Sequence, residues 1–167
     1  PVVLMGYMNP VLQYGMEKFC AKAAGAGVDG VILPDLPLYE FETQYRHLFQ
    51  QYNLHFIFLV TLETSEERIR RIDSLGSGFL YAVSSSSTTG NSKAIEGQEA
   101  YFIRLDAMQL RNPVLVGFGI RSRQDFTAAC KHTRGAIIGS AYIDALSRGA
   151  DIPQSTKEFL NTILREA

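Results

Sequence analysis

The sequence predicts an α/β fold of the (β/α)8 barrel class. Short apolar runs alternate with longer stretches of helical periodicity along the 167 residues. The runs are continuously apolar, which is typical of parallel strands covered by helices on both faces. The last two runs each end at a glycine and lead into a polar or helical segment. In barrels the loops after strands seven and eight, with a short extra helix, bind phosphate, so these two runs predict a phosphate site.

The elements follow from the two hydrophobic periods of the chain. Apolar, largely β-branched runs predict strands, at residues 2–5, 28–33, 54–60, 78–83, 114–117 and 135–138. Helical spacing of apolar residues predicts helices, at residues 15–24, 38–52, 65–75, 97–110, 123–131, 141–147 and 155–165. The helix at 141–147 is the short extra helix. Residues 1–167 show no linker and no shift in composition, so we expect a single domain.

Three of these helices carry the sequence signature of a capping box. In this motif a hydroxyl residue stands three positions before an acidic residue and begins the helix. The pairs are Thr64 with Glu67, Ser122 with Asp125, and Ser155 with Glu158. We expect each hydroxyl residue to be the N-cap of its helix.

The number of strands is lower than a closed barrel requires. Six βα units are visible, whereas a barrel has eight and about 250 residues. The chain begins inside a predicted strand, so we expect about two further units upstream of Pro1. These six strands would represent strands 3–8. An open six-stranded sheet is the alternative, but it would place both glycine-ended strands at a sheet edge, away from the switch point where open sheets bind ligands.

Composition excludes several classes of protein. The chain is 46% hydrophobic and has a net charge of −1, which argues against a nucleic-acid partner. Cys20 and Cys130 are far apart in the sequence, which favours reduced thiols in a cytoplasmic protein. Residues 1–5 are too short for a membrane span and lack the basic flank of a signal peptide. The three histidines show no metal-ligand spacing, so we expect no metal.

Gly119, Gly139 and Ser140 are the residues that we expect at the phosphate. Each follows an apolar run, where backbone N–H groups at the start of a helix attract an anion. An alternative interpretation is that the glycines only permit tight turns between strand and helix. The pairing of two such turns favours the binding role.

Five sequence blocks carry a resemblance to the tryptophan synthase alpha chain family. One of them contains Val28-Asp29-Gly30 followed by Pro34-Asp35-Leu36-Pro37, and another contains Thr89-Gly90. The blocks occur in the family's order, at residues 4–10, 27–37, 81–90, 117–120 and 139–141. The resemblance extends from the first residue to about Ser140.

The resemblance implies a lyase of tryptophan biosynthesis. Its reaction would be an aldol-type cleavage of indole-3-glycerol phosphate to indole and glyceraldehyde 3-phosphate, without metal or cofactor. The implied partner is the tryptophan synthase beta chain, which uses pyridoxal phosphate, in an alpha2beta2 heterotetramer. The family's catalytic glutamate and aspartate have no counterpart in this sequence, so we expect them upstream of Pro1 and expect no activity from this chain by itself.

The resemblance also assigns roles to individual residues. Thr89 and Gly90 would belong to a lid, with Gly90 adding a backbone N–H to the phosphate site; otherwise this polar stretch is a solvated connector. The family often has arginine or glycine where this chain has Ser-Ser-Ser-Thr at 85–88. Asp35 and Asn9 would couple the site to the partner; otherwise Asp35 is a helix N-cap and Asn9-Pro10 a turn. The substrate pocket would be lined by Met5, Tyr7, Ile32, Pro34, Tyr81 and Phe118, which are otherwise packing residues.

Two other functions remain open at this point. The chain could be a noncatalytic phosphate-binding module that docks on the beta chain and activates it. It could also belong to another phosphate-binding barrel enzyme, of histidine or thiamine biosynthesis, but the Pro34-Asp35-Leu36-Pro37 block argues against this alternative.

Overall fold

The computed structural model describes residues 1–84, 93–149 and 151–164, and for residues 93–97 it describes the backbone. The chain divides into two compact units. The first unit contains Pro1–Val60, Thr64–Tyr81 and Arg111–Pro113; the second contains Thr61–Glu63, Ala82–Leu110 and Val114–Ala167. The prediction of a single domain stays a prediction.

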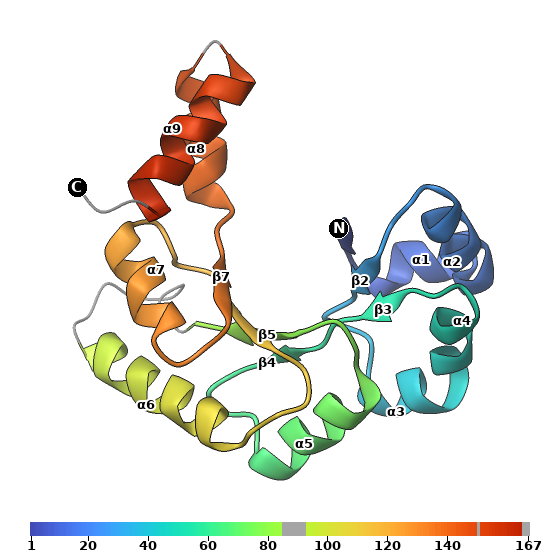
Figure 1. Ribbon diagram of the computed structural model, residues 1–167. Helices are drawn as coiled ribbons and strands as arrows, with labels where there is room; N and C mark the ends of the chain where they lie inside the picture. Colours follow the sequence, from blue (N-terminus) through green and yellow to red (C-terminus); the bar gives the residue numbers. More distant parts are fainter. Residues whose placement is uncertain (85–92, 150, 165–167) are drawn as a thin grey trace. The chain divides into compact units, whose positions relative to one another are not determined.

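The first unit is built on a parallel three-stranded sheet (Figure 1). Its order is β1-β2-β3, with β1 at Val3–Met5, β2 at Gly30–Ile32 and β3 at His55–Phe56. Met5 pairs with Ile32, and Gly30 pairs with His55. The carboxyl ends of β1 and β2 therefore lie side by side, whereas His55 lies level with the amino end of β2. β1 is an edge strand, and all three of its apolar residues are exposed.

Helices connect these strands. Those of the first unit are α1 (Met8–Tyr14), α2 (Met16–Gly25), α3 (Leu38–Glu40), the π-helix η1 (Phe41–Tyr45), α4 (Arg46–Gln51) and α5 (Glu66–Leu75). The predicted helix at 38–52 is therefore present but changes its winding at η1. The N-cap of α5 is Ser65, whose hydroxyl accepts a hydrogen bond from the Arg68 backbone N–H at 3.3 Å, and not Thr64 as predicted.

A cluster of phenylalanines fills the core of the first unit. Phe41 stacks on Phe56 with ring centroids 4.3 Å apart, and Phe49 meets Phe56 edge-on at 4.9 Å. Phe58 meets Phe56 at 4.7 Å. Aromatic pairs in these geometries add to the stabilisation from burial alone. The cluster joins η1 and α4 to the strand run at 54–60.

That strand run is interrupted. β3 is followed, after Ile57-Phe58, by β4 at Leu59–Val60, and the two short strands belong to different sheets. The second sheet has the order β4-β5-β6-β7, and the boundary between the units falls inside β5 (Leu80–Val83).

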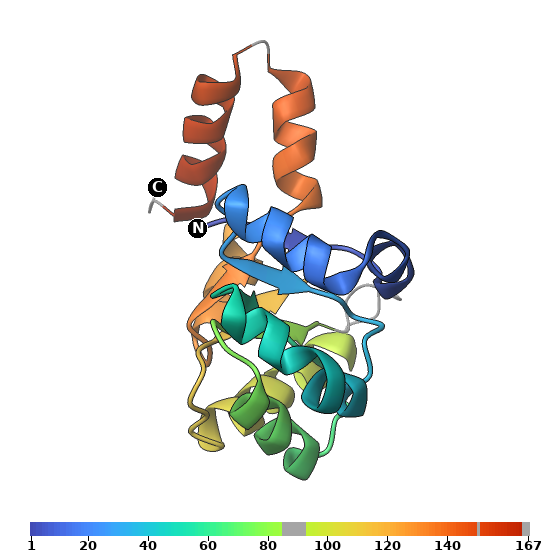
Figure 2. The same cartoon turned by 90° about the vertical axis from the view of Figure 1, so that its right-hand side faces the viewer.

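The second unit contains β6 (Val114–Gly117) and β7 (Gly135–Ile137), which pair in parallel with Gly117 opposite Ile137. Its helices are α6 (Lys93–Ala107), α7 (Arg123–Cys130), α8 (Ser140–Arg148) and α9 (Ile152–Leu164). Figure 2 shows α8 and α9 packed as an antiparallel pair.

Two further interpretations of the sequence are wrong, the turn at Asn9-Pro10 and the helix start at Ser155. Asn9-Pro10 lies within the first turn of α1 and not in a loop, because proline is tolerated where the helix needs no backbone N–H donor. Ser155 lies inside α9, since the Asp151 carboxylate accepts a hydrogen bond from the Gln154 N–H at 2.7 Å and the Asp151 carbonyl accepts one from the Ser155 N–H at 3.0 Å. The capping box of Ser122 and Asp125 is confirmed.

The predicted α/β class is confirmed by the parallel pairing of the strands and the helices that connect them. Within the described part of the chain, every helix is too short or too polar to cross a membrane.

Candidate functional site

The loop after β6 has an uncommon backbone conformation. Phe118 has a φ of +66° and Gly119 a φ of +73°, so two successive residues occupy the left-handed region. A bulky side chain rarely adopts this conformation, and such strain is concentrated at functional sites. Phe118 is 42% exposed, so burial of its ring does not explain the conformation.

Ser84 fixes this loop. It follows β5, has no exposed surface, and donates a hydrogen bond from its hydroxyl to the Phe118 carbonyl. Its backbone N–H donates to the Gly117 carbonyl at 3.0 Å. Ser84 was not among the predicted site residues, because in the sequence it is the first residue of a polar run. Its only signal is a hydroxyl residue directly after a buried apolar strand.

The loop after β7 ends at the amino terminus of α8. Gly139 is the N-cap, and its carbonyl accepts hydrogen bonds from the Tyr142 and Ile143 N–H groups at 3.0 and 3.1 Å. None of the described side chains caps this end. The N–H groups of Ser140 and Ala141 have no acceptor among the described residues, and they lie at the positive end of the helix dipole.

Space remains next to Gly139. A Cβ built on it would meet no other atom within 4 Å, and its φ of −104° is accessible to any residue. Because β6 and β7 are parallel and in register, Gly119 and Gly139 follow the same ends of neighbouring strands. The two residues predicted for the phosphate are therefore on adjacent loops of the second unit.

The amino terminus of α7 differs from that of α8. The Asp125 carboxylate accepts hydrogen bonds from the Arg121 N–H at 3.0 Å and from the Ser122 N–H and hydroxyl at 2.9 Å. Partial burial raises the pKa of Asp125, but the hydrogen bonds from Arg121 and Ser122 outweigh it and lower the pKa overall. The prediction that both strand ends present bare N–H groups to an anion is therefore wrong for α7, whose own carboxylate occupies that position.

The predicted pocket residues of the first unit differ in exposure. Met5 and Tyr7 are 52% and 70% exposed, and Pro34 is exposed as well. Ile32 is 4% exposed, which makes it a core residue beneath that surface. Tyr81 lies inside β5 and is 6% exposed, and burial raises the pKa of its phenol.

Asp35 connects two loops of the first unit. The Met8 backbone N–H donates to both of its carboxylate oxygens, at 2.9 and 3.0 Å. Asp35 thereby caps α1, 27 residues earlier in the chain, and holds the loop after β2 against the loop after β1. Asn9 is exposed in the first turn of the same helix.

Two predicted residues, Thr89 and Gly90, lie outside the described residues. Among the residues that are described, no three His, Cys, Asp or Glu side chains are grouped so that they could hold a metal ion. The geometry therefore offers an anion site of backbone N–H groups at α8.

The chain matches the family model for the tryptophan synthase alpha chain over residues 1–166. It is 48% identical over 164 residues to the tryptophan synthase alpha chain of Parabacteroides distasonis, covering 98% of this chain and 64% of that protein. It is 51% identical over 144 residues to that of Christiangramia forsetii, covering 86% of this chain and 56% of that protein.

Solved structures of tryptophan synthase alpha subunits are similar to this chain. The tryptophan synthase A-subunit of Pyrococcus furiosus superimposes with a TM-score of 0.84 at 29% identity, over 98% of this chain and 66% of that one. A chain of the Pyrococcus furiosus a2b2 complex gives a TM-score of 0.85 at 30% identity, with the same coverage. These alpha subunits are (β/α)8 barrels, as the sequence predicts for this chain.

The chain spans less than two thirds of the length of these relatives. The match nevertheless includes both glycine-ended strands, Asp35 and α8, because it extends over almost every residue of this chain. The chain belongs to the tryptophan synthase alpha chain family.

Proposed function

We propose that this chain is the phosphate-binding part of a tryptophan synthase alpha subunit, a carbon–carbon lyase of tryptophan biosynthesis. Its substrate would be indole-3-glycerol phosphate, cleaved to indole and glyceraldehyde 3-phosphate. The observation that carries the proposal is the open amino terminus of α8 beside the strained loop of Gly119. A dianionic phosphate fits this position because the N–H groups and the dipole of α8 both favour negative charge.

The residues around the phosphate would orient the substrate. Gly139 leaves room for the phosphate oxygens, and Ser140 adds a hydroxyl at the start of α8. Phe118, on the preceding loop, presents an exposed ring that can pack against an apolar part of the ligand. Met5 and Tyr7, which are exposed in the first unit, stay predictions for the substrate pocket.

Bond cleavage requires an acid for the indole ring carbon, a carboxylate near the indole nitrogen and a base for the glycerol hydroxyl. We assign no residue of this chain to these roles. The reaction needs no electron sink beyond the indole ring, so we propose that the subunit uses no cofactor and that pyridoxal phosphate belongs to the partner. We also propose a cytoplasmic location.

The proposed partner is the tryptophan synthase beta chain, because a related alpha chain occurs in an a2b2 complex. Asp35 would transmit the partner's state to the site through α1, since it holds the first N–H of that helix. Asn9, exposed in the same turn, would contact the partner. Thr89 and Gly90 would close over the substrate, so a Thr89→Val variant is expected to lose more turnover than ligand affinity.

The binding experiment compares wild-type chain with Gly139→Val by calorimetry, using indole-3-glycerol phosphate. We expect the variant to stay folded, since nothing within 4 Å meets an added Cβ, and to lose phosphate-ligand binding. Gly25→Val is the matched control, because that glycine also has free space around it but lies in α2. Unchanged affinity in folded Gly139→Val protein would overturn the assignment.

The second measurement is the release of indole in the presence of the beta chain. Release of indole supports the lyase. Activation of the beta chain without any release, in a protein that binds the ligand, supports the noncatalytic module instead. If the chain binds a sugar phosphate that contains no indole group tightly, and does not bind indole-3-glycerol phosphate, this supports a different barrel enzyme.

A further inference from the structure

A polar pocket lies in the first unit, apart from the residues predicted for the substrate site. Its volume is about 370 Å³, within the usual range of small-ligand sites. Three of its lining residues carry or can acquire a positive charge: Arg46, His55 and Arg111. None of its lining residues is acidic.

The pocket lies at the amino-terminal side of the sheet. His55 is the first residue of β3 and pairs with Gly30, the first residue of β2. The candidate substrate residues of this unit follow Met5 and Ile32, at the carboxyl ends of β1 and β2. The pocket and those residues therefore lie at opposite ends of the strands.

Arg111 is held in place by backbone carbonyls. Its Nη2 donates to the carbonyls of Asp73 and Gly76 at 2.9 Å and to that of Ser74 at 3.5 Å. A guanidinium has five N–H donors, so the donors on Nε and Nη1 remain for a ligand. Fixing one side of the guanidinium in this way reduces the entropy lost when the other side binds.

Arg46 and His55 also line this pocket and add donors to it. The Arg46 side chain has no hydrogen-bond or ion-pair partner among the described residues. His55 Nδ1 lies 3.0 Å from the Ser77 hydroxyl, which orients the ring and leaves Nε2 without a protein partner in the described chain.

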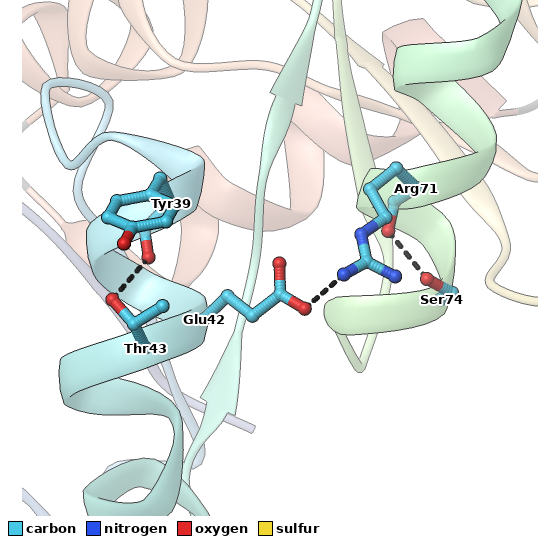
Figure 3. Close-up of polar contacts among 5 residues, drawn as sticks. All are labelled: Tyr39, Glu42, Thr43, Arg71 and Ser74. Atoms are coloured by element: carbon cyan, nitrogen blue, oxygen red, sulfur yellow. Dashed lines mark hydrogen bonds and ion pairs between the residues drawn. The ribbon is translucent and has the colours of Figure 1, made fainter.

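Two carboxylates on the elements around the pocket, those of Glu42 and Asp73, have other partners. Glu42 of η1 forms an ion pair with Arg71 of α5, and Figure 3 shows this contact between the two elements. In the same view the Ser74 hydroxyl donates to the Arg71 carbonyl at 2.7 Å, and the Thr43 hydroxyl to the Tyr39 carbonyl at 2.8 Å. Asp73 accepts hydrogen bonds from the Arg111 and Asn112 backbone. The carboxylates of Glu42 and Asp73 therefore do not neutralise the positive charge of the pocket.

One feature opposes anion binding. The carboxyl ends of α4 and α5 border the pocket, and their dipoles are negative there. Arg111 occupies the carbonyls at the end of α5, however, and α4 has only six residues. Two arginines with free donors outweigh the partial charge of one short helix.

We propose that this pocket binds a small dianion, a phosphate monoester or a dicarboxylate, between the guanidinium groups of Arg46 and Arg111 with His55 as a third donor. Paired arginines suit both ligands, because phosphate and carboxylate oxygens accept bidentate hydrogen bonds. The proposal does not depend on the phosphate site at α8.

The test is an NMR titration of the histidine ring protons with inorganic phosphate and, separately, with succinate. The chain has three histidines, so the His55 signals can be assigned by substitution. We expect a saturable shift of His55 with a Kd of about 1 mM, and no comparable saturation with chloride at equal ionic strength. If only phosphate saturates the shift, the pocket binds phosphate esters. If only succinate does, it binds dicarboxylates, and if both do, it binds small dianions of either kind.

Variants separate the pocket from general charge effects. Arg46→Gln is expected to weaken binding about 10-fold, whereas Arg68→Gln, which removes the same charge from α5 outside the pocket, should leave it unchanged. Gly139→Val should also leave the His55 response unchanged. No saturation, equal responses to chloride, or equal losses in Arg46→Gln and Arg68→Gln would overturn the proposal. If Gly139→Val lost the His55 response, this would also overturn the proposal, but it would not contradict the phosphate site at α8.

Discussion

Asp73 and Asn112, which are 39 positions apart, form a buried hydrogen-bonded pair. The Asn112 N–H and side-chain amide donate to Asp73 Oδ1 at 2.9 and 2.8 Å, and the Arg111 N–H donates to Oδ2 at 2.7 Å. A carboxylate can be buried at this depth because its oxygens are satisfied by donors. This pair attaches the end of α5 to the turn before β6.

Replacing Asp73 by alanine is expected to lower the free energy of unfolding by about 2–3 kcal/mol, because three donors lose their acceptor in a buried place. Urea unfolding followed by circular dichroism measures the change. Asp106→Ala is the control, since that carboxylate is exposed on α6. Equal effects of the two substitutions would show that the buried pair contributes nothing specific.

The capping box of α7 predicts a dependence of stability on pH. The pKa of Asp125 is lower in the folded chain than its ordinary value of 3.8, so its contribution is complete above that value and is lost as the pH falls through the folded pKa. Asp125→Asn should therefore destabilise the chain by about 1 kcal/mol at neutral pH and much less at acidic pH. Urea unfolding of both proteins at several pH values tests this. A constant difference across the acidic range would contradict it.

The two phosphate-site glycines should respond differently to alanine. Gly119→Ala places a side chain at φ +73°, which costs about 1 kcal/mol, while Gly139→Ala has an ordinary φ and free space. Thermal unfolding of both variants distinguishes them. A Gly139→Ala protein that is as destabilised as Gly119→Ala would show that Gly139 is needed for the fold itself.

The two cysteines should differ in reactivity. Cys20 has no exposed surface, and burial raises the pKa of its thiol to about 11, whereas Cys130 is partly exposed. A disulfide reagent should therefore modify Cys130 in the native chain and Cys20 only after unfolding, because the thiolate is the reactive form. Mass spectrometry of the labelled chain identifies the modified residue. Labelling of native Cys20 at the rate of Cys130 would contradict this expectation.

Most strands could be predicted from the sequence because buried parallel strands leave a strong apolar signal. Residues 114–117 are strand as predicted, and β7 ends one residue earlier than expected. Helix ends were harder, because several hydroxyl and acidic residues compete for the same cap. Asp151 begins α9 in place of Ser155, and only the hydrogen bonds of the folded chain decide between them.

The candidate site was predictable in part. Gly119 and Gly139 stand out in sequence because both end an apolar run, and the structure places them on adjacent loops. The contact of Ser84 with Phe118 spans 34 positions, and that of Asp35 with Met8 spans 27. No local pattern encodes such contacts. The pocket of Arg46 and Arg111 was not predicted for the same reason, because its lining residues come from segments that are distant in the sequence.

The exposed edge of β1 has a practical consequence for work with this chain. Val3, Leu4 and Met5 present apolar side chains on a strand that has one neighbour in the described sheet. Unprotected edges of this kind recruit strands from other molecules, and proteins usually guard against this with charge or proline. If residues 1–167 are handled as a chain by themselves, self-association through β1 should therefore limit the usable concentration, and a lysine in place of Leu4 would be the first change to make against precipitation.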